Sequence, residues 1–202
     1  YIPSRFLLCH EGTHRQKPRA LFYYVLEVCM NTQTKNITIA GLCLALAMVL
    51  PFLTGQIPQI GSALSPMHIP VLLCGFLAGG FWGLLVGAAA PLLRFALFGM
   101  PPLMPMGIAM AFELATYGLV AGLVYRMLPG KPIHVYIALV TAMLAGRVVF
   151  GIAMYLLMKS AGNVYTMQMF LSGAFVKAVP GIILHLLLIP PIVLALEKSG
   201  FL

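Results

Sequence analysis

"GGFWGLLVGAAAPLLRFALFG", residues 79–99, decides the fold class, because Arg94 is its only charged residue. About 20 consecutive apolar residues are enough for a helix to cross the hydrocarbon core of a bilayer. The stretch also places Gly79, Gly83 and Gly87 four residues apart, on one face of such a helix. We therefore interpret it as a transmembrane helix with a narrow packing face.

The composition of the whole chain leads to the same class. Of its 202 residues, 61% are hydrophobic and 8% are charged, whereas a soluble domain carries about 25% charged residues. The net charge is +8, but much of it precedes residue 36, and no basic stretch is interleaved with aromatic residues as in a nucleic-acid-binding surface. The basic residues are better explained as orienting an integral membrane protein. The four cysteines form no CxxC pair, which favours small buried residues over a metal site.

The first 29 residues differ from the rest. They are mixed and aperiodic, and they lack the apolar run and cleavage site of a signal peptide. We expect Met30 to be the native first residue, residues 1–29 to be a leader outside the fold, and residues 30–202 to be one membrane domain.

Breakers and polar loops divide the domain into six apolar segments, near residues 37–53, 67–79, 81–98, 106–125, 135–158 and 167–196. Five are long enough to span a bilayer. The second is short, and is tilted, partly re-entrant or continuous with the third around Gly79–Gly80. Basic residues collect in the loops of one side, and basic loops stay cytoplasmic. The predicted fold is an all-α integral membrane protein, a six-transmembrane-helix bundle with both termini cytoplasmic.

Other small residues repeat the spacing of four. Gly118 and Gly122 do so in the fourth segment, where packing inside the bundle is the favoured interpretation. Gly41 and Ala45 form a similar pair in the first segment, where contact with a second chain competes with internal packing.

Six ionisable residues fall inside the segments: His68, Arg94, Glu113, Arg147, Lys177 and His185. A charge at membrane depth costs about 2.5–3.5 kcal/mol on insertion scales, so each needs a reason. Counting along the helices puts Glu113, Arg147 and Lys177 on the order of 13–17 Å below the outer surface. Arg94 should lie nearer that surface and His68 nearer still, whereas His185 falls in the inner half as a satisfied core histidine.

Three cations and one carboxylate therefore share the outer half of the predicted bundle. A structural ion network is one interpretation, but it leaves two positive charges without an acid. The other interpretation is a site for a polar ligand, to which Tyr117 could add a hydrogen bond. We expect Glu113, Arg147 and Lys177 to be neighbours, with Arg94 or another cation free to meet the ligand.

The chain lacks the motifs of a membrane enzyme. It contains neither HExxH nor the phosphate-binding loop of an ATPase, and no Ser–His or paired-acid arrangement. We predict no catalytic residue, no bound metal and no cofactor.

The run "SPMHIPVLLCGFLAGGFWGLLVGAAAPLLRFALFGMPP", followed by "AMAFELATYGLVAGLVY", resembles the substrate-binding S components of energy-coupling factor (ECF) vitamin transporters. The resemblance covers about residues 36–198. It implies a six-helix bundle that binds a vitamin or precursor near the outer face, beneath the loop after the first helix. It also implies partners, namely a transmembrane coupling subunit and two ATPase subunits, with Gly41 and Ala45 docking on the former.

The ligand stays open at this point. Riboflavin, pantothenate, pyridoxal-type compounds, a thiamine pyrimidine precursor and folate are all compatible, and the excess of cations leans toward a carboxylate or phosphate. The competing hypotheses are a stand-alone secondary transporter or small channel, with Glu113 as an ion or proton relay, and a scaffold whose charges only hold helices together.

Overall fold

The computed structural model describes residues 32–53, 65–128, 132–162, 166, 168 and 179–199. The chain divides into two units, residues 1–35 and 36–202, and the helices described below belong to the second unit except for the first residues of α2. The predicted leader 1–29, most of the loop after the first helix and Lys177 lie outside the described residues.

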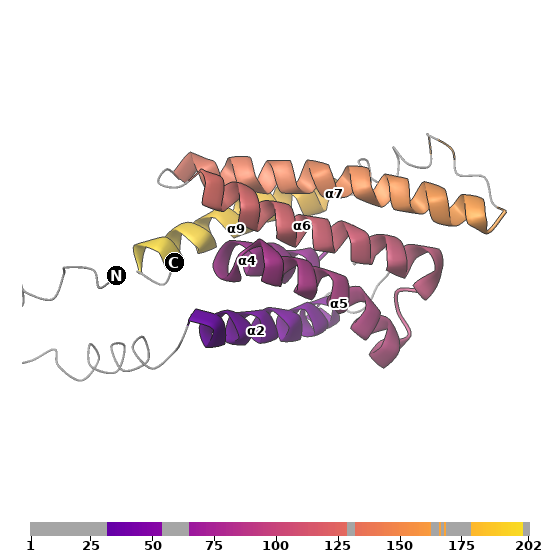
Figure 1. The fold of residues 1–202 in the computed structure, drawn as a ribbon, viewed down its shortest axis with the longest axis horizontal. Helices are drawn as coiled ribbons and strands as arrows, with labels where there is room; N and C mark the ends of the chain where they lie inside the picture. Colours follow the sequence, from indigo (N-terminus) through magenta and orange to yellow (C-terminus); the bar gives the residue numbers. More distant parts are fainter. Residues whose placement is uncertain are drawn as a thin grey trace, which may run out of the picture. The chain divides into compact units, whose positions relative to one another are not determined.

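Within these ranges all of the regular secondary structure is helical. The elements are α2 (Thr32–Leu53), α4 (His68–Ala78), α5 (Gly80–Phe98), a short π-helical turn η1 (Leu103–Gly107), α6 (Ile108–Met127), α7 (Pro132–Ser160) and α9 (Val179–Lys198). Five stretches are long and apolar enough to cross a membrane, and α4 is a shorter apolar helix. The six predicted helices are therefore present (Figure 1). Their orientation in the bilayer remains a prediction.

The short second helix ends at Gly79. This glycine has φ 96° and ψ 168°, a conformation that side chains with a Cβ rarely adopt. A Cβ at Gly79 would also lie only 2.3 Å from Nη2 of Arg126. The same guanidinium group donates a hydrogen bond to the Ala78 carbonyl at 3.3 Å. The third segment is thus a separate helix. With 11 residues, α4 is about 16 Å long, roughly half of the hydrocarbon thickness.

The predicted glycine face packs α5 against α6. A Cβ at Gly83 would lie 2.7 Å from the Gly118 carbonyl oxygen, and one at Gly87 would lie 2.3 Å from that of Leu114. A Cβ at Gly122 would lie 2.2 Å from the Gly80 nitrogen. The residue numbers of the contacts on α6 therefore fall as those on α5 rise, so the two helices are antiparallel. Their backbones touch because the glycines leave no side chain between them, which confirms the packing predicted for both motifs.

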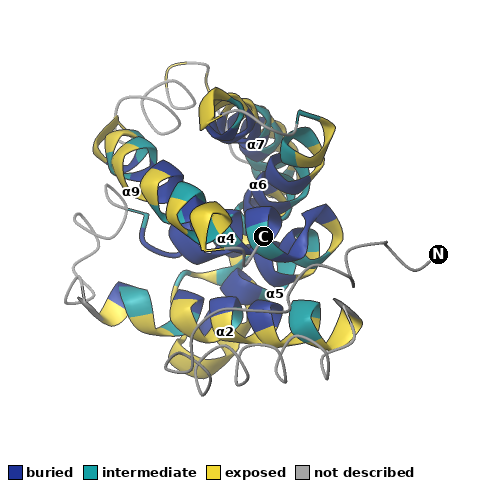
Figure 2. Cartoon of the chain, turned by 90° about the vertical axis from the view of Figure 1, so that its left-hand side faces the viewer, coloured by how far each residue is buried: buried dark blue, intermediate teal, exposed yellow. Residues whose placement is uncertain are grey.

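Buried and exposed residues fit a membrane bundle. Figure 2 shows α4 among the other helices, and most of its side chains are buried. Residues of α4 join both buried clusters, one shared with α6, α7 and α9 and one with α2, α5 and α6. Outward faces carry large apolar side chains, such as Leu42, Phe81, Leu97 and Leu187. Such faces are suited to lipid rather than to water.

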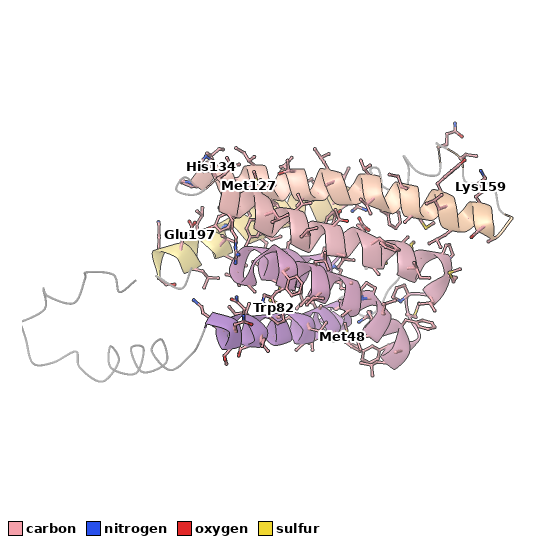
Figure 3. The ribbon with its side chains drawn as sticks, in the orientation of Figure 1. Met48, Trp82, Met127, His134, Lys159 and Glu197 are labelled. Atoms are coloured by element: carbon pink, nitrogen blue, oxygen red, sulfur yellow. The ribbon has the colours of Figure 1, made fainter. Side chains whose placement is uncertain are left out.

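The described helices also have distinguishable ends. Figure 3 shows Met127, His134 and Glu197 at one end of the bundle and Lys159 at the other. Tyr125 donates a hydrogen bond to the Glu197 carboxylate, which ties the end of α6 to the end of α9. The predicted topology assigns this end to the cytoplasm.

Candidate functional site

A buried carboxylate lies at the centre of the polar groups inside the bundle. Glu113 Oε1 accepts a hydrogen bond from the Tyr117 hydroxyl at 2.9 Å and lies 3.0 Å from Arg147 Nη1. His68 Nε2 lies 3.8 Å from Glu113 Oε2. All four residues are buried. We call these residues, together with His185, the polar cluster.

Helical spacing and one glycine explain how the cluster is assembled. Glu113 and Tyr117 are four residues apart on α6, so they lie on the same face and can contact each other. Arg147 comes from α7, and the residue before it is Gly146. A Cβ at Gly146 would lie 2.1 Å from the Tyr117 ring. Glycine is therefore needed for α7 to come close enough for Arg147 to reach the carboxylate.

His68 reaches the cluster because α4 begins there. The Ser65 carbonyl accepts a hydrogen bond from the His68 backbone N–H at 3.0 Å, which closes a turn before the helix. The His68 and Tyr117 ring centroids are 5.3 Å apart. His68 therefore lies level with Glu113, because α4 starts beside that acid. Its depth relative to Arg94 stays a prediction.

His185 on α9 was expected to be a satisfied core histidine in the inner half of the bundle. It is buried and interacts with the Ser65 backbone, and its ring is stacked on that of His68, with ring centroids 5.9 Å apart and an interplanar angle of 21°. Counting positions along one helix could not reveal this contact, since it depends on how α9 packs against α4.

Arg94 lies in a different environment from the one expected. Its Nη1 donates a hydrogen bond to the Met48 carbonyl of α2 at 3.2 Å. Its guanidinium carbon lies 5.5 Å from the Phe52 ring centre and 5.6 Å from that of Phe98. It makes no ion pair with the acids that the structure describes. Arg94 therefore links α5 to α2 through Nη1, and a contact with the ligand stays a prediction for it.

The charge of the described cluster is balanced. Glu113 and Arg147 form one ion pair, and His68 and His185 carry a charge only when protonated. The proposed third member, Lys177, lies outside the described residues. Over the described ranges, no group of three or more His, Cys, Asp or Glu side chains is arranged to hold a metal ion. The cluster has hydrogen-bonding groups suited to a polar organic ligand.

One face of α2 is open. Gly41 and Ala45 are both exposed, and a Cβ at Gly41 would meet nothing within 4 Å. Their neighbours Leu42 and Val49 are also exposed. The opposite side of α2 is buried through Cys43 and Ala47. Gly41 and Ala45 therefore do not pack against the described helices, in contrast to the glycines of α5 and α6.

Comparison with known proteins agrees with this architecture. The family model for the ECF transporter, substrate-specific component, matches residues 35–193, which include all the described helices almost completely. No curated protein and no solved structure matches the chain. The match covers more than half of the chain, so the protein belongs to the family of substrate-specific components of ECF transporters, which are multi-pass cell-membrane binding subunits and not enzymes.

Proposed function

We propose that this S component captures a water-soluble vitamin or vitamin precursor at the outer face of the membrane and delivers it into the cell through an ATP-driven ECF module. The observation that carries the proposal is the polar cluster. A buried acid, a buried arginine and two buried histidines come together from four helices. Nδ1 of His68 and one ring nitrogen of His185 remain without a hydrogen-bond partner among the described residues.

Within the cluster the proposed roles differ. Glu113 holds Arg147 and Tyr117 in place, because its Oε1 contacts both. His68, His185 and the remaining N–H groups of Arg147 are the groups proposed to contact the ligand. Lys177 stays a proposed ligand contact on sequence grounds. Arg94 is proposed to hold the outer part of α2, because it is bound to the Met48 carbonyl.

The contacts of Glu113 do not favour the alternative of a proton or ion relay. A relay carboxylate must exchange its proton or ion during transport. Glu113 is instead engaged by an arginine at 3.0 Å and by a tyrosine hydroxyl at 2.9 Å. Both interactions stabilise the ionised carboxylate.

The direct test is native mass spectrometry of the protein purified in mild detergent. High-affinity capture predicts that the protein retains a small molecule, whose mass identifies it. An Arg147→Met variant that folds should lose that molecule. A folded wild-type protein that retains no small molecule and binds none of the candidate vitamins would contradict the proposal.

The energising partners are proposed to be a transmembrane coupling subunit and two ATPase subunits, with the open face of α2 as the docking surface. Exposed small residues allow another helix to approach closely. Gly41→Trp and Ala45→Leu should therefore abolish vitamin uptake and co-purification of the coupling subunit, while ligand retention and unfolding stay unchanged.

Ala195→Leu provides a matched control for docking, since Ala195 is an exposed small residue on α9. It should leave uptake intact. If Gly41→Trp unfolds the protein, or if uptake survives in both α2 variants, the docking surface lies elsewhere.

A further inference from the structure

The polar cluster contains buried atoms that lack partners, and these atoms restrict the ligand. They are Nδ1 of His68, the ring nitrogen of His185 that is not directed at the Ser65 backbone, and Nε of Arg147, whereas His68 Nε2 faces Glu113 Oε2 at 3.8 Å. Buried polar atoms in native proteins are almost always hydrogen-bonded to protein, water or ligand. Since the inference rests on the proposed function, we take these atoms as the groups that the ligand must satisfy.

These three atoms include both donors and acceptors. A neutral imidazole has one N–H donor and one bare acceptor nitrogen, and Arg147 Nε is a donor. With the N–H of His68 directed at Glu113 and that of His185 at the Ser65 backbone, the two remaining ring nitrogens are acceptors and Nε is a donor. A carboxylate or phosphate that has lost its protons has only acceptor oxygens. It could satisfy Nε, but it would leave both bare imidazole nitrogens buried and unpaired.

Charge leads to the same conclusion. Among the described groups around the histidines, the permanent charges are the Glu113 carboxylate and the Arg147 guanidinium, and they compensate each other at 3.0 Å. A second buried anion would need another cation. Protonating one imidazole would supply it, but His68 already faces Glu113, and the buried His185 ring lies beside that guanidinium and 5.9 Å from the His68 ring. Burial and repulsion oppose a new positive charge there. Arg94 is engaged with α2 instead.

We propose that the site recognises the edge of an uncharged nitrogen heterocycle that carries hydrogen-bond donors and acceptors side by side. Such an edge pairs its N–H or amino groups with the bare imidazole nitrogens. Its ring nitrogen or carbonyl oxygen accepts from Arg147 Nε. The ligand contacts His68 and His185 through this neutral edge and not through a carboxylate or phosphate, contrary to the leaning that the count of cations suggested.

The test compares the binding of neutral and charged compounds to the full chain in lipid nanodiscs, by isothermal titration calorimetry. The neutral rings are riboflavin, pyridoxal and 4-amino-5-hydroxymethyl-2-methylpyrimidine. The charged probe is pantothenate, and its control is panthenol, in which a hydroxymethyl group replaces the carboxylate. We expect one of the neutral rings to bind at least tenfold more tightly than pantothenate, and panthenol to bind no more weakly than pantothenate.

If pantothenate binds at least tenfold more tightly than panthenol and than every neutral ring, the carboxylate is recognised. The inference is then overturned while vitamin capture stands. Loss of that pantothenate binding in Lys177→Met would show that this lysine supplies the extra cation. If no compound binds and none co-purifies, both the inference and the proposed function fail.

Variants at His185 test the role of the imidazole itself. His185→Leu removes the bare nitrogen that accepts from the ligand and should weaken binding of the neutral ring at least tenfold. His185→Gln keeps one donor group and one acceptor and should retain most of the affinity. His134→Leu on α7, away from the cluster, is the control and should bind as the wild type does. Equal affinity of the Leu and Gln variants would overturn the proposed contact, and if the Leu variant does not fold, unimpaired binding by His68→Leu would do the same.

Discussion

Replacing Glu113 by glutamine isolates the charge of the buried acid from its hydrogen bonds. In the wild type both close contacts, from the Tyr117 hydroxyl and from Arg147 Nη1, are made to Oε1. A glutamine whose carbonyl oxygen takes that position keeps both hydrogen bonds. Its amide nitrogen then replaces Oε2, which in the wild type lies 3.8 Å from His68 Nε2. The substitution therefore leaves the shape intact and removes one negative charge.

The expected loss of stability follows from these contacts. Removing one partner of a buried ion pair costs about 3–5 kcal/mol, because the other charge is left uncompensated. The two retained hydrogen bonds contribute about 1 kcal/mol each, so Glu113→Gln should lower the free energy of unfolding by about 1–3 kcal/mol. Ligand affinity should fall as well, since Arg147 is no longer held by a charge.

The assay is unfolding in mixed micelles titrated with SDS, followed by far-UV circular dichroism. Glu197→Gln, at an exposed acid near the end of α9, is the control. It should change stability by less than about 0.5 kcal/mol, because the glutamine carbonyl oxygen can still accept the hydrogen bond from Tyr125. Adding Arg147→Met to Glu113→Gln should recover part of the loss, because the orphaned charge is removed. The reasoning is refuted if Glu113→Gln is as stable as the wild type, or if the two substitutions destabilise additively.

Three further predictions concern the scaffold. Gly118→Ala should destabilise the protein by about 1–3 kcal/mol, because the new Cβ would lie 2.3 Å from the backbone of α5. Gly41→Ala, whose Cβ would meet nothing within 4 Å, should be neutral in the same SDS titration or raise stability by up to about 1 kcal/mol. Equal effects of the two substitutions on stability would contradict the packing. Arg94→Met should lower the SDS midpoint while native mass spectrometry finds the ligand still bound, and loss of the ligand from a folded variant would return Arg94 to the site. In a variant without native cysteines, Ser160→Cys should react with an impermeant maleimide on intact cells and Ser199→Cys only after permeabilisation; the reverse pattern would invert the topology.

The helices were predictable because their causes are local. An apolar run long enough to cross the bilayer must satisfy its own backbone hydrogen bonds, so it forms a helix. This requirement located five spans, and the glycine spacing located the face on which α5 and α6 meet. The pairing of Glu113 with Arg147 was also predictable, since a buried acid needs a nearby cation and both residues lay at similar depth.

The composition of the site was less predictable because its causes are not local. His185 and Arg94 were assigned by counting along single helices, a procedure that ignores where each helix starts and which neighbour it faces. Because α4 begins at His68 beside Glu113, His68 lies level with that acid. The packing of α9 then places His185 against His68. The Arg94 guanidinium contacts the Met48 carbonyl of α2 and two phenylalanine rings. A count along α5 alone does not reveal these neighbours.

The amino-acid sequence is enough to identify a helical membrane protein in which one buried acid needs a compensating cation. Both conclusions follow from properties of single segments, namely their hydrophobic length and the cost of burying a charge. The tertiary structure decided which cation compensates it, which histidines stand beside it and which small residues remain exposed. Those outcomes depend on distances of a few ångströms between helices, and such distances are set by close packing at positions such as Gly83, Gly118 and Gly146.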